Sequence, residues 1–400
     1  MTMGPARRVG ASATATPLLP HGQRASLADV VPSLLAGLGV AGFANALQLT
    51  PTHGACLLLV DGLGWLALQE HSADAPFLSS LAAGQEPITA GFPATTAAGV
   101  ATIGTGMPAG QHGIVGFSFA VPEGGLINAL SWHTHGGGHR VDLRERFVPE
   151  EIQPRPTALE RAAAAGVQVV LAVPEVHRGS GLNRAALRGG EMKGVHALGD
   201  LAGNVLAALS AASGGARAFC YAYHGDLDLL GHVYGVGSLP WRLQLGHVDR
   251  LAASIADGLP RGVRLVVIAD HGMVTVPEES RLDFDTEPAL QAGVRLLGGD
   301  ARARYVYTEP GAANDVLATW RDVIGDRAWI LTRDEAIAAG WFGPLVENHI
   351  RDRIGNIIVA ARTEFAVIRS QATPKLSGLI GHHGSLTPDE QLIPALVHDS

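Results

Sequence analysis

The chain has 400 residues, of which 29 are basic and 37 acidic, so its formal net charge is −8. Hydrophobic residues make up 47% of it and charged residues only 16%, which predicts a large buried core. The mildly acidic balance argues against nucleic-acid binding through a basic surface, and no nucleic-acid partner is expected.

Residues 1–24 are rich in Ala, Pro, Gly and Arg, and they are predicted to form a loosely held N-terminal arm. The arm contains an Arg pair but no apolar run long enough for a signal peptide. The most apolar later stretch, residues 30–47, is interrupted by Pro32 and by glycines, which favours a helix and a turn over a membrane span. We therefore expect a cytoplasmic protein with no membrane partner, and nothing in the sequence predicts its oligomeric state.

Apolar runs that end in polar turns alternate with helical stretches along much of the chain. The first run ends at Asp61-Gly62, as a buried parallel strand does when its carboxyl end carries a functional turn. This alternation predicts an α/β fold with a mostly parallel central sheet flanked by helices, and ligands bind such sheets beyond the carboxyl ends of the strands. The predicted strands are 56–60, 167–173, 217–223 and 263–269, and the predicted helices between them are 157–165, 199–213 and 240–257.

Two segments interrupt this pattern and divide the chain into domains. Residues 117–155 are rich in Gly, His and Arg and are predicted to form a cap-like loop over the sheet edge. Residues 277–376 are predicted to form a small α/β insertion, so that the catalytic core comprises residues 25–276 together with 377–400. The strand candidates in the insertion are 294–299, 303–309, 328–332, 355–361 and 365–370, around a helix near 312–324.

The chain has only two cysteines, Cys56 and Cys220. Both lie in apolar runs that are predicted to be buried strands. Buried thiols are therefore expected rather than a disulfide or a pair of metal ligands.

Six residues with metal-binding side chains fall on four short polar interruptions of the apolar chain. Three Asp and three His suit two sites with mixed oxygen and nitrogen ligands, for zinc or a similar divalent ion. Each fragment alone also fits an ordinary turn, a helix cap or a solvated face, and it is their recurrence beside apolar strands and glycine turns that favours metal binding. The six are Asp61, Asp228, His232, Asp270, His271 and His383.

The spacing of these residues predicts how they converge. Asp228 and His232 are four residues apart, which places both side chains on one face of a helix. Asp270 and His271 are adjacent, so they can converge only in the turn that leaves a strand. Asp226, two residues before Asp228, is an alternative ligand on the same segment.

A further group of histidines lies within the predicted cap-like loop. His133, His135 and His139 have a spacing that permits a third metal site. No carboxylate or cysteine accompanies them in that run, which favours a loop over the cleft that touches substrate.

In order and spacing, the motifs VDG, PATTAAGVATIGTGMPAGQHGI, DLLGH, ADHGM and HHG resemble the type I phosphodiesterase/nucleotide pyrophosphatase branch of the alkaline phosphatase superfamily. The resemblance covers residues 55–120, 217–276 and 381–384. It implies an alkaline phosphatase-like core that holds two divalent metal ions, with zinc expected. It also implies a small-molecule phosphate ester as substrate, cleaved at a phosphate diester or nucleotide pyrophosphate bond.

The resemblance also implies a nucleophile that forms a phospho-threonine intermediate. Counting back from Thr105-Gly106, this hydroxyl falls on Thr96 rather than on Thr95. Family phosphodiesterases often carry an Asn three residues after the nucleophile, and here that position is Gly99. Either a backbone amide, with Gly99 as the candidate, or another residue is then expected to contact the phosphate, or the substrate differs.

The resemblance further divides the ligands into two sets: Asp61, Asp270 and His271 for the zinc that binds the nucleophile, and Asp228, His232 and His383 for the other.

Three other functions fit parts of the pattern. A phosphonate hydrolase would use the same site with a threonine nucleophile. A phosphomonoesterase is disfavoured because the nucleophile segment has no arginine for a dianion. A metal-stabilised binding protein without turnover is the alternative of another class, although no ligand or nucleophile is missing.

Overall fold

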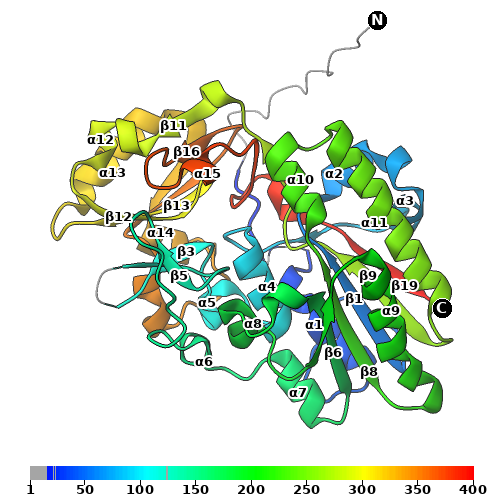
Figure 1. Cartoon of the computed structure of the whole chain (residues 1–400). Coiled ribbons are helices and arrows are strands. Elements are labelled where there is room, and N and C mark those ends of the chain that lie inside the picture. The colour runs from blue at the N-terminus through cyan, green and yellow to red at the C-terminus, as the bar shows by residue number, and fades with distance from the viewer. Residues whose placement is uncertain (1–15, 21, 23, 123–124) are drawn as a thin grey trace, which may run out of the picture.

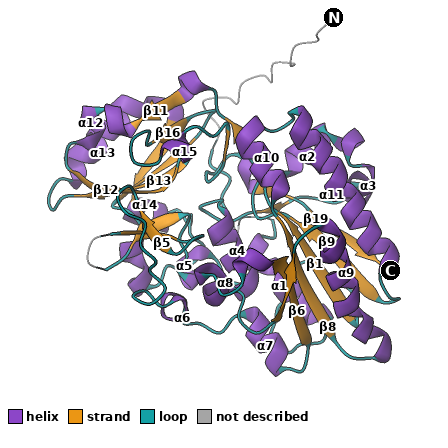
Figure 2. Ribbon diagram, viewed as in Figure 1, coloured by secondary structure: helices purple, strands orange, loops and turns teal. Residues whose placement is uncertain are grey.

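The computed structural model describes residues 16–20, 22, 24–122 and 125–400. Most of the predicted N-terminal arm, residues 1–24, therefore lies outside the described residues. The rest of the chain forms a mixed α/β structure with a mainly parallel central sheet, as the alternation of apolar runs and helical stretches predicts (Figures 1 and 2). No helix in the described part of the chain is both long and apolar enough to cross a membrane.

The central sheet has six strands in the order β19-β9-β1-β8-β6-β7. All neighbours are parallel except β19, which pairs antiparallel with β9. Every residue of β1 and β9 is buried, as expected of parallel strands covered on both faces. The strands are β1 (Gly54–Val60), β6 (Gln168–Pro174), β7 (Glu191–Val195), β8 (Ala218–His224), β9 (Val263–Ile268) and β19 (Ala395–Asp399).

Helices cover both faces of this sheet. On one face α9 and α11 pack against the strands, and on the other lie α1, α4 and α7 (Figure 1). The core helices are α1 (Leu27–Gly37), α2 (Trp65–Glu70), α3 (Pro76–Ala82), α4 (Thr96–Thr105), α5 (Ala109–His112), α7 (Ala158–Ala164), α8 (Gly181–Ala186), α9 (Leu198–Leu209), α10 (Asp226–Tyr234), α11 (Leu239–Gly258) and α16 (Pro388–Gln391).

The four strands predicted from apolar runs are all present as β1, β6, β8 and β9, and the three predicted helices are present as α7, α9 and α11. Cys56 and Cys220 lie opposite each other on β1 and β8, and both are buried free thiols, which confirms that prediction. Two edge strands were not predicted. The β7 segment EMKGV is half exposed and has no apolar run, while β19 follows the last ligand segment.

Residues 277–376 contain a second sheet with its own apolar cluster around Trp320. Its four strands run antiparallel in the order β12-β13-β15-β14, and it lies beside the central sheet (Figure 1). The elements of this segment are β11 (Arg281–Asp283), α12 (Pro288–Gln291), β12 (Val294–Asp300), β13 (Ala303–Thr308), α13 (Ala313–Ile324), β14 (Ala328–Thr332), α14 (Arg333–Ala338), β15 (Ile357–Ala361), β16 (Ala366–Ile368) and α15 (Pro374–Ser377).

The segment 117–155 differs from the predicted loop. It forms a three-stranded antiparallel sheet of β3 (Ser118–Ala120), β4 (Leu126–Asn128) and β5 (His133–His135), followed by α6 (Pro149–Ile152). The Ser118 hydroxyl donates to Gly299 O at 2.9 Å, and Ala120 N donates to the Tyr307 hydroxyl at 2.9 Å. These bonds join the small sheet to the insertion rather than to the edge of the central sheet. Strands of three residues are too short to show a periodic pattern in the sequence.

Three two-stranded pairs complete the fold, and one of them bears on the site. Strand β17 (Gly381–His382) pairs antiparallel with β10 (Val274–Thr275), which brings the C-terminal segment next to the turn after β9. The others are β2 (Ile88–Thr89) with β18 (Leu392–Ile393), and β11 with β16.

Candidate metal centre

The carboxyl ends of three neighbouring strands place the three aspartates at one edge of the central sheet. Asp61 follows β1 directly, Asp228 lies in the first turn of α10 just after β8, and Asp270 follows β9. Gly62 has φ +74°, and a Cβ on it would lie 3.0 Å from the Asp228 side chain. A glycine is therefore needed for β1 to turn so close to α10.

One ligand group, the buried cluster, consists of Asp61, Asp270 and His271, whose candidate ligand atoms all lie within 4.8 Å of one another. Asp270 and His271 converge in the turn after β9, as expected, and the His271 amide donates to Asp270 Oδ1 at 3.1 Å. The side chains of these residues are almost fully removed from solvent.

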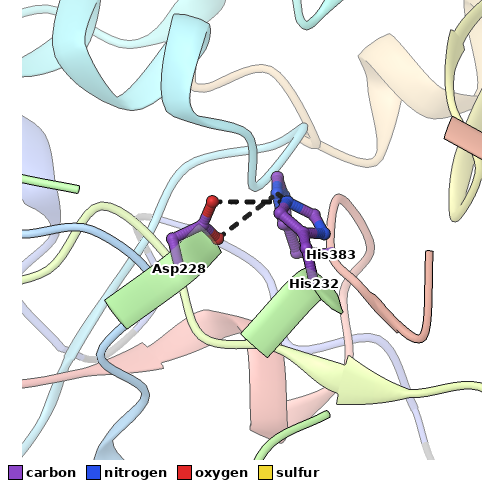
Figure 3. A group of neighbouring side chains, drawn as sticks. All are labelled: Asp228, His232 and His383. Atoms are coloured by element: carbon purple, nitrogen blue, oxygen red, sulfur yellow. Dashed lines mark hydrogen bonds and ion pairs between the residues drawn. The ribbon is translucent and has the colours of Figure 1, made fainter. Parts of the chain in front are cut away.

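The other group, the cavity-facing cluster, consists of Asp228, His232 and His383 (Figure 3). Asp228 and His232 lie one turn apart on α10, with His232 Nε2 3.3 Å from Asp228 Oδ2. His383 follows β17 and points toward the same carboxylate, 3.8 Å from Asp228 Oδ1. The structure thus divides the six predicted ligands into the same two sets that the resemblance implies; their role as ligands stays a prediction.

The three histidines are held in one orientation by backbone carbonyls. The Nδ1 atoms of His271, His232 and His383 lie 3.0, 2.7 and 2.9 Å from the carbonyl oxygens of Gly272, Gly381 and Ala94, respectively. A carbonyl can only accept, so in each neutral ring Nδ1 carries the proton and Nε2 presents a lone pair to the site. This arrangement is typical of metal-ligating histidines.

Several buried polar atoms of the two clusters have no protein partner. Within the described chain, Asp228 Oδ1 and Asp270 Oδ2 are buried without a hydrogen bond. His232 Nε2 and His383 Nε2 lie 3.3 Å apart, so that in the neutral rings both can direct a lone pair at one ion. Cations bound at the clusters would satisfy these atoms, so the donor set fits divalent metal ions with oxygen and nitrogen ligands.

Without metal, the acid groups of the two clusters behave differently. Burial and the charges of Asp270 and Asp228 raise the pKa of Asp61 well above its usual value. Burial and the Asp228 charge likewise raise the pKa of Asp270 to about 7. Burial also disfavours the Asp228 carboxylate, but the attraction of His232 outweighs it and lowers the pKa of Asp228. The same attraction overcomes the burial of His232 and raises its pKa to about 9.

The hydroxyl of Thr96 lies against the buried cluster. Thr96 is the first residue of α4, and its Oγ1 lies 3.2 Å from His271 Nε2 and 3.4 Å from Asp61 Oδ1. Thr95, the alternative, is the N-cap residue of α4, and its buried hydroxyl has no hydrogen-bond partner among the described residues. The loop before α4 is fixed by a bond from Ala94 N to Gly384 O at 3.0 Å.

Gly99 does not have the role expected of it. Its amide donates to Thr95 O at 2.8 Å within the first turn of α4, so it is not available to a phosphate. A Cβ on Gly99 would lie 2.5 Å from Asp270 Cβ. Gly99 is therefore the position where α4 approaches the turn after β9, and this contact, invisible in the sequence, explains why no asparagine can stand there.

A cavity of about 220 Å³ opens onto the cavity-facing cluster and Thr96. Residues from the core, from the small sheet and from the insertion line it, among them Phe117, His135 and Arg304. The two alternative sets of ligands considered from the sequence do not belong to the centre. Asp226 is exposed, and in the described residues His133, His135 and His139 form no cluster with metal-binding geometry.

Tyr223, the penultimate residue of β8, was not predicted from the sequence as part of the site. Its hydroxyl donates to Asp61 Oδ2 at 2.6 Å and so orients the carboxylate. It lies two residues after Tyr221 in an apolar strand, where a tyrosine indicates only packing. The register of β8 against β1, which sets Tyr223 opposite Leu59, is what brings the hydroxyl to Asp61.

A family model described as type I phosphodiesterase / nucleotide pyrophosphatase matches residues 55–386. The chain belongs to this family. The resemblance seen in the sequence is thereby confirmed, and the chain is a phosphodiesterase/nucleotide pyrophosphatase-like hydrolase of phosphoesters. No curated protein sequence matches it.

Solved structures of similar fold include two kinds of hydrolase. Murine ectonucleotide pyrophosphatase/phosphodiesterase 5, an inactive threonine-to-alanine variant in complex with AMP, has a TM-score of 0.64 at 14% identity, covering 86% of this chain and 87% of that one. Phosphonoacetate hydrolase from Sinorhizobium meliloti 1021 in complex with phosphonoformate has a TM-score of 0.60 at 19% identity, covering 87% of this chain and 90% of that one. At these identities the likeness shows only that the fold is shared. The two neighbours resemble the fold of this chain to a similar degree.

Proposed function

We propose that the protein is a two-metal hydrolase that cleaves phosphate diester or nucleotide pyrophosphate bonds, with Thr96 as nucleophile. The observation that carries this proposal is the position of Thr96 Oγ1. It lies 3.2 Å from His271 Nε2 in the buried cluster, and Thr96 also lines the cavity shared with the other cluster. The AMP bound by the murine neighbour is consistent with a nucleotide substrate.

The first turn of α4 supplies both the nucleophile and a binding site for the phosphoryl group. The backbone amides of residues 96–98, in the first turn of α4, have no acceptor in the described chain. They face the position where a phosphoryl group would meet Thr96 Oγ1, and a helix N-terminus favours an anion there. Thr96 Oγ1 would attack phosphorus in line, so that an O–P bond forms while the bond to the leaving oxygen breaks.

The residues that surround Thr96 hold it ready for this attack. The Thr96 hydroxyl donates to His271 Nε2 or Asp61 Oδ1, and the tautomer of His271 and the Tyr223 bond to Asp61 keep these acceptors in place. When bound, two divalent ions, for which we propose zinc, supply the charge that stabilises an alkoxide and the phosphoryl oxygens. Water would then hydrolyse the phospho-threonine and restore the Thr96 hydroxyl.

The proposal is tested with zinc-loaded wild type, Thr96→Ala and Thr95→Ala. Hydrolysis of bis-p-nitrophenyl phosphate and p-nitrophenyl phosphate is measured alongside the metal content of each protein. We expect diester preference in wild type, a loss of about 10³-fold or more in Thr96→Ala with two metals retained, and at most a few-fold change in Thr95→Ala. Monoester preference would point to a phosphatase, and activity that survives in Thr96→Ala would contradict the nucleophile.

Hydrolysis of a phosphonate is the second candidate function. It is favoured by the fold shared with phosphonoacetate hydrolase over 87% of this chain. Release of inorganic phosphate from phosphonoacetate, together with no hydrolysis of bis-p-nitrophenyl phosphate, would establish it. Two bound metals without turnover of any of these esters would instead support a metal-stabilised binding protein.

A further inference from the structure

The far wall of the substrate cavity is built by residues outside the metal centre. Arg304 of β13 and Asp300 of β12 come from the insertion, and His135 of β5 comes from the small sheet. Thr96 and the cavity-facing cluster line the same cavity. A molecule whose phosphoryl group sits at Thr96 can therefore reach these residues through the same cavity.

Arg304 has an unusual environment for a buried cation. It is only 5% exposed, and no carboxylate of the described chain lies within ion-pair distance of its guanidinium. Its Nε and Nη2 donate to Val367 O at 2.8 and 2.7 Å. Its Nη1 donates to no described residue and is not among the polar atoms sealed from solvent, and the Arg304 side chain lines the cavity.

Arg302, two residues earlier, is a buried arginine that does have a carboxylate partner. It is 1% exposed, and its Nε and Nη2 form a two-point ion pair with Glu390, both bonds at 2.8 Å. A buried charge without such a partner is costly. The carboxylate that Arg302 finds within the protein is missing for Arg304, whose free nitrogen instead reaches the cavity.

Two neighbours complete the polar wall. Burial and the nearby Arg304 charge lower the pKa of His135 to about 4, so its ring is neutral at pH 7 and can donate or accept one hydrogen bond. The ring is fixed edge-on to Phe117 at 5.3 Å. Asp300 lines the cavity too, but its Oδ1 accepts from Ala301 N and its carboxylate lies beyond ion-pair distance of Arg304.

We propose that Arg304 Nη1, assisted by His135, binds a second anionic group of the substrate, a carboxylate or a phosphate, while the scissile phosphoryl group lies at Thr96. The preferred substrate then carries a second anionic group in addition to the scissile phosphoryl group. A planar guanidinium held on one side by Val367 O presents its remaining N–H groups in a fixed direction, which suits recognition of an oxyanion. This inference rests on the proposed function, because Thr96 defines where the first group binds.

Binding of matched non-hydrolysable probes to the zinc-loaded Thr96→Ala protein tests the subsite by calorimetry. Propylphosphonate carries one anionic group, and 3-phosphonopropionate carries the same phosphonate with a carboxylate at the other end. Phosphonocarboxylates with one to four methylene groups cover the unknown span, and ethane-1,2-diphosphonate distinguishes a phosphate-like second group from a carboxylate. We expect at least one doubly anionic probe to bind about tenfold or more tightly than the alkylphosphonate of its length.

Three variants in the same background assign this advantage to Arg304. Arg304→Gln should remove it and leave propylphosphonate affinity within about twofold, and Arg304→Lys should keep only part of it because the charge remains without the fork. Arg281→Gln is the matched control: Arg281 also holds a carbonyl, Val276 O, with Nε and Nη2, but its Nη1 is satisfied by the backbone carbonyl of Ser377 and its side chain does not line the cavity. It should leave every affinity unchanged.

The outcomes separate the two proposals. Equal affinity for singly and doubly anionic probes, or an advantage that survives in Arg304→Gln, would overturn the subsite while the proposed function stands. Failure of propylphosphonate to bind any of the proteins would contradict the phosphoryl site at Thr96 and with it the subsite. If Arg304→Gln does not fold, Arg304→Lys decides, because an undiminished advantage there would rule out recognition by the guanidinium fork.

Discussion

The buried cluster and the cavity-facing cluster have the same kinds of ligand but opposite electrostatic states. Asp61, Asp270 and His271 are at most 2% exposed, and in the absence of metal the pKa values of both aspartates are raised. In the cavity-facing cluster the Asp228 and His232 side chains are 14% and 20% exposed, and they form an ion pair that lowers the pKa of the acid and raises that of the base.

Under the proposed function, this difference implies separate roles for the two clusters. The buried cluster gathers like charges away from water, so a cation there is the natural counter-charge, and Thr96 lies against it. The cavity-facing cluster already balances its charge with a proton on His232, and a metal ion must displace that proton. The first cluster would therefore activate the nucleophile, while the second meets the substrate and solvent.

Removal of one ligand from each cluster should have the largest effect and should distinguish the two. We expect Asp61→Asn to lower kcat for bis-p-nitrophenyl phosphate by at least about 10³-fold, because the charge next to Thr96 is lost. His232→Ala should cost about 10 to 100-fold and recover partly with added imidazole, since its place opens to the cavity. Equal losses, or imidazole rescue of both, would contradict the assigned roles.

The stability of the metal-free protein should reveal the cost of burying like charges in the buried cluster. The pKa of Asp270 rises from 3.8 in the unfolded chain to about 7 in the folded protein. Asp270 therefore leaves the free energy of unfolding unchanged below pH 3.8 and lowers it progressively as the pH rises to 7. Asp270→Asn should therefore stabilise the metal-free protein by on the order of 4 kcal/mol at pH 8. Urea unfolding with a chelator present should show this gain at pH 8 and none near pH 4, and a gain independent of pH would refute the account.

Zinc affinity of the cavity-facing cluster should depend on pH over an unusually high range. The pKa of His232 is raised to about 9, so below that pH zinc binding must release its proton. We expect the affinity to rise about tenfold per pH unit, and roughly 100-fold between pH 7 and 9. Competition with a zinc-buffering chelator measures it, and an affinity that levels off at pH 7 would show that the ion pair with Asp228 does not form.

Loss of the tyrosine bond to Asp61 should have the smallest effect. Tyr223→Phe removes the hydroxyl that donates to Asp61 Oδ2 at 2.6 Å, and we expect about tenfold weaker metal binding at the buried cluster. Tyr221→Phe is the matched control, because Tyr221 is buried on the same strand without a hydrogen bond to a ligand in the described chain. Equal metal affinity in the two variants would show that Tyr223 only packs.

Sequence reasoning worked best where chemistry and secondary structure are local. The buried strands that precede Asp61 and Asp270 are uniform apolar runs, and the four-residue spacing of Asp228 and His232 needs only one turn of helix. It predicted a cap-like loop at residues 117–155, of which Phe117 and His135 line the cavity, but it did not predict the strands of this segment or the contact made by Gly99. The short strands of that segment are stabilised by bonds to the insertion, and Gly99 is required by its contact with Asp270.

The sequence by itself determined which residue types occur at the ends of the central strands, and thereby the α/β class, the family and the six candidate ligands. Only the tertiary structure decided how they combine, because His383 reaches Asp228 through the pairing of β17 with β10, and Tyr223 reaches Asp61 through the register of β8. The environment of Arg304 was also decided by the tertiary structure. It places this arginine of the insertion in the cavity lining, where its guanidinium bonds to a carbonyl and not to a carboxylate. A pattern along the chain records local preference, whereas burial and charge pairing arise between residues that are distant in sequence.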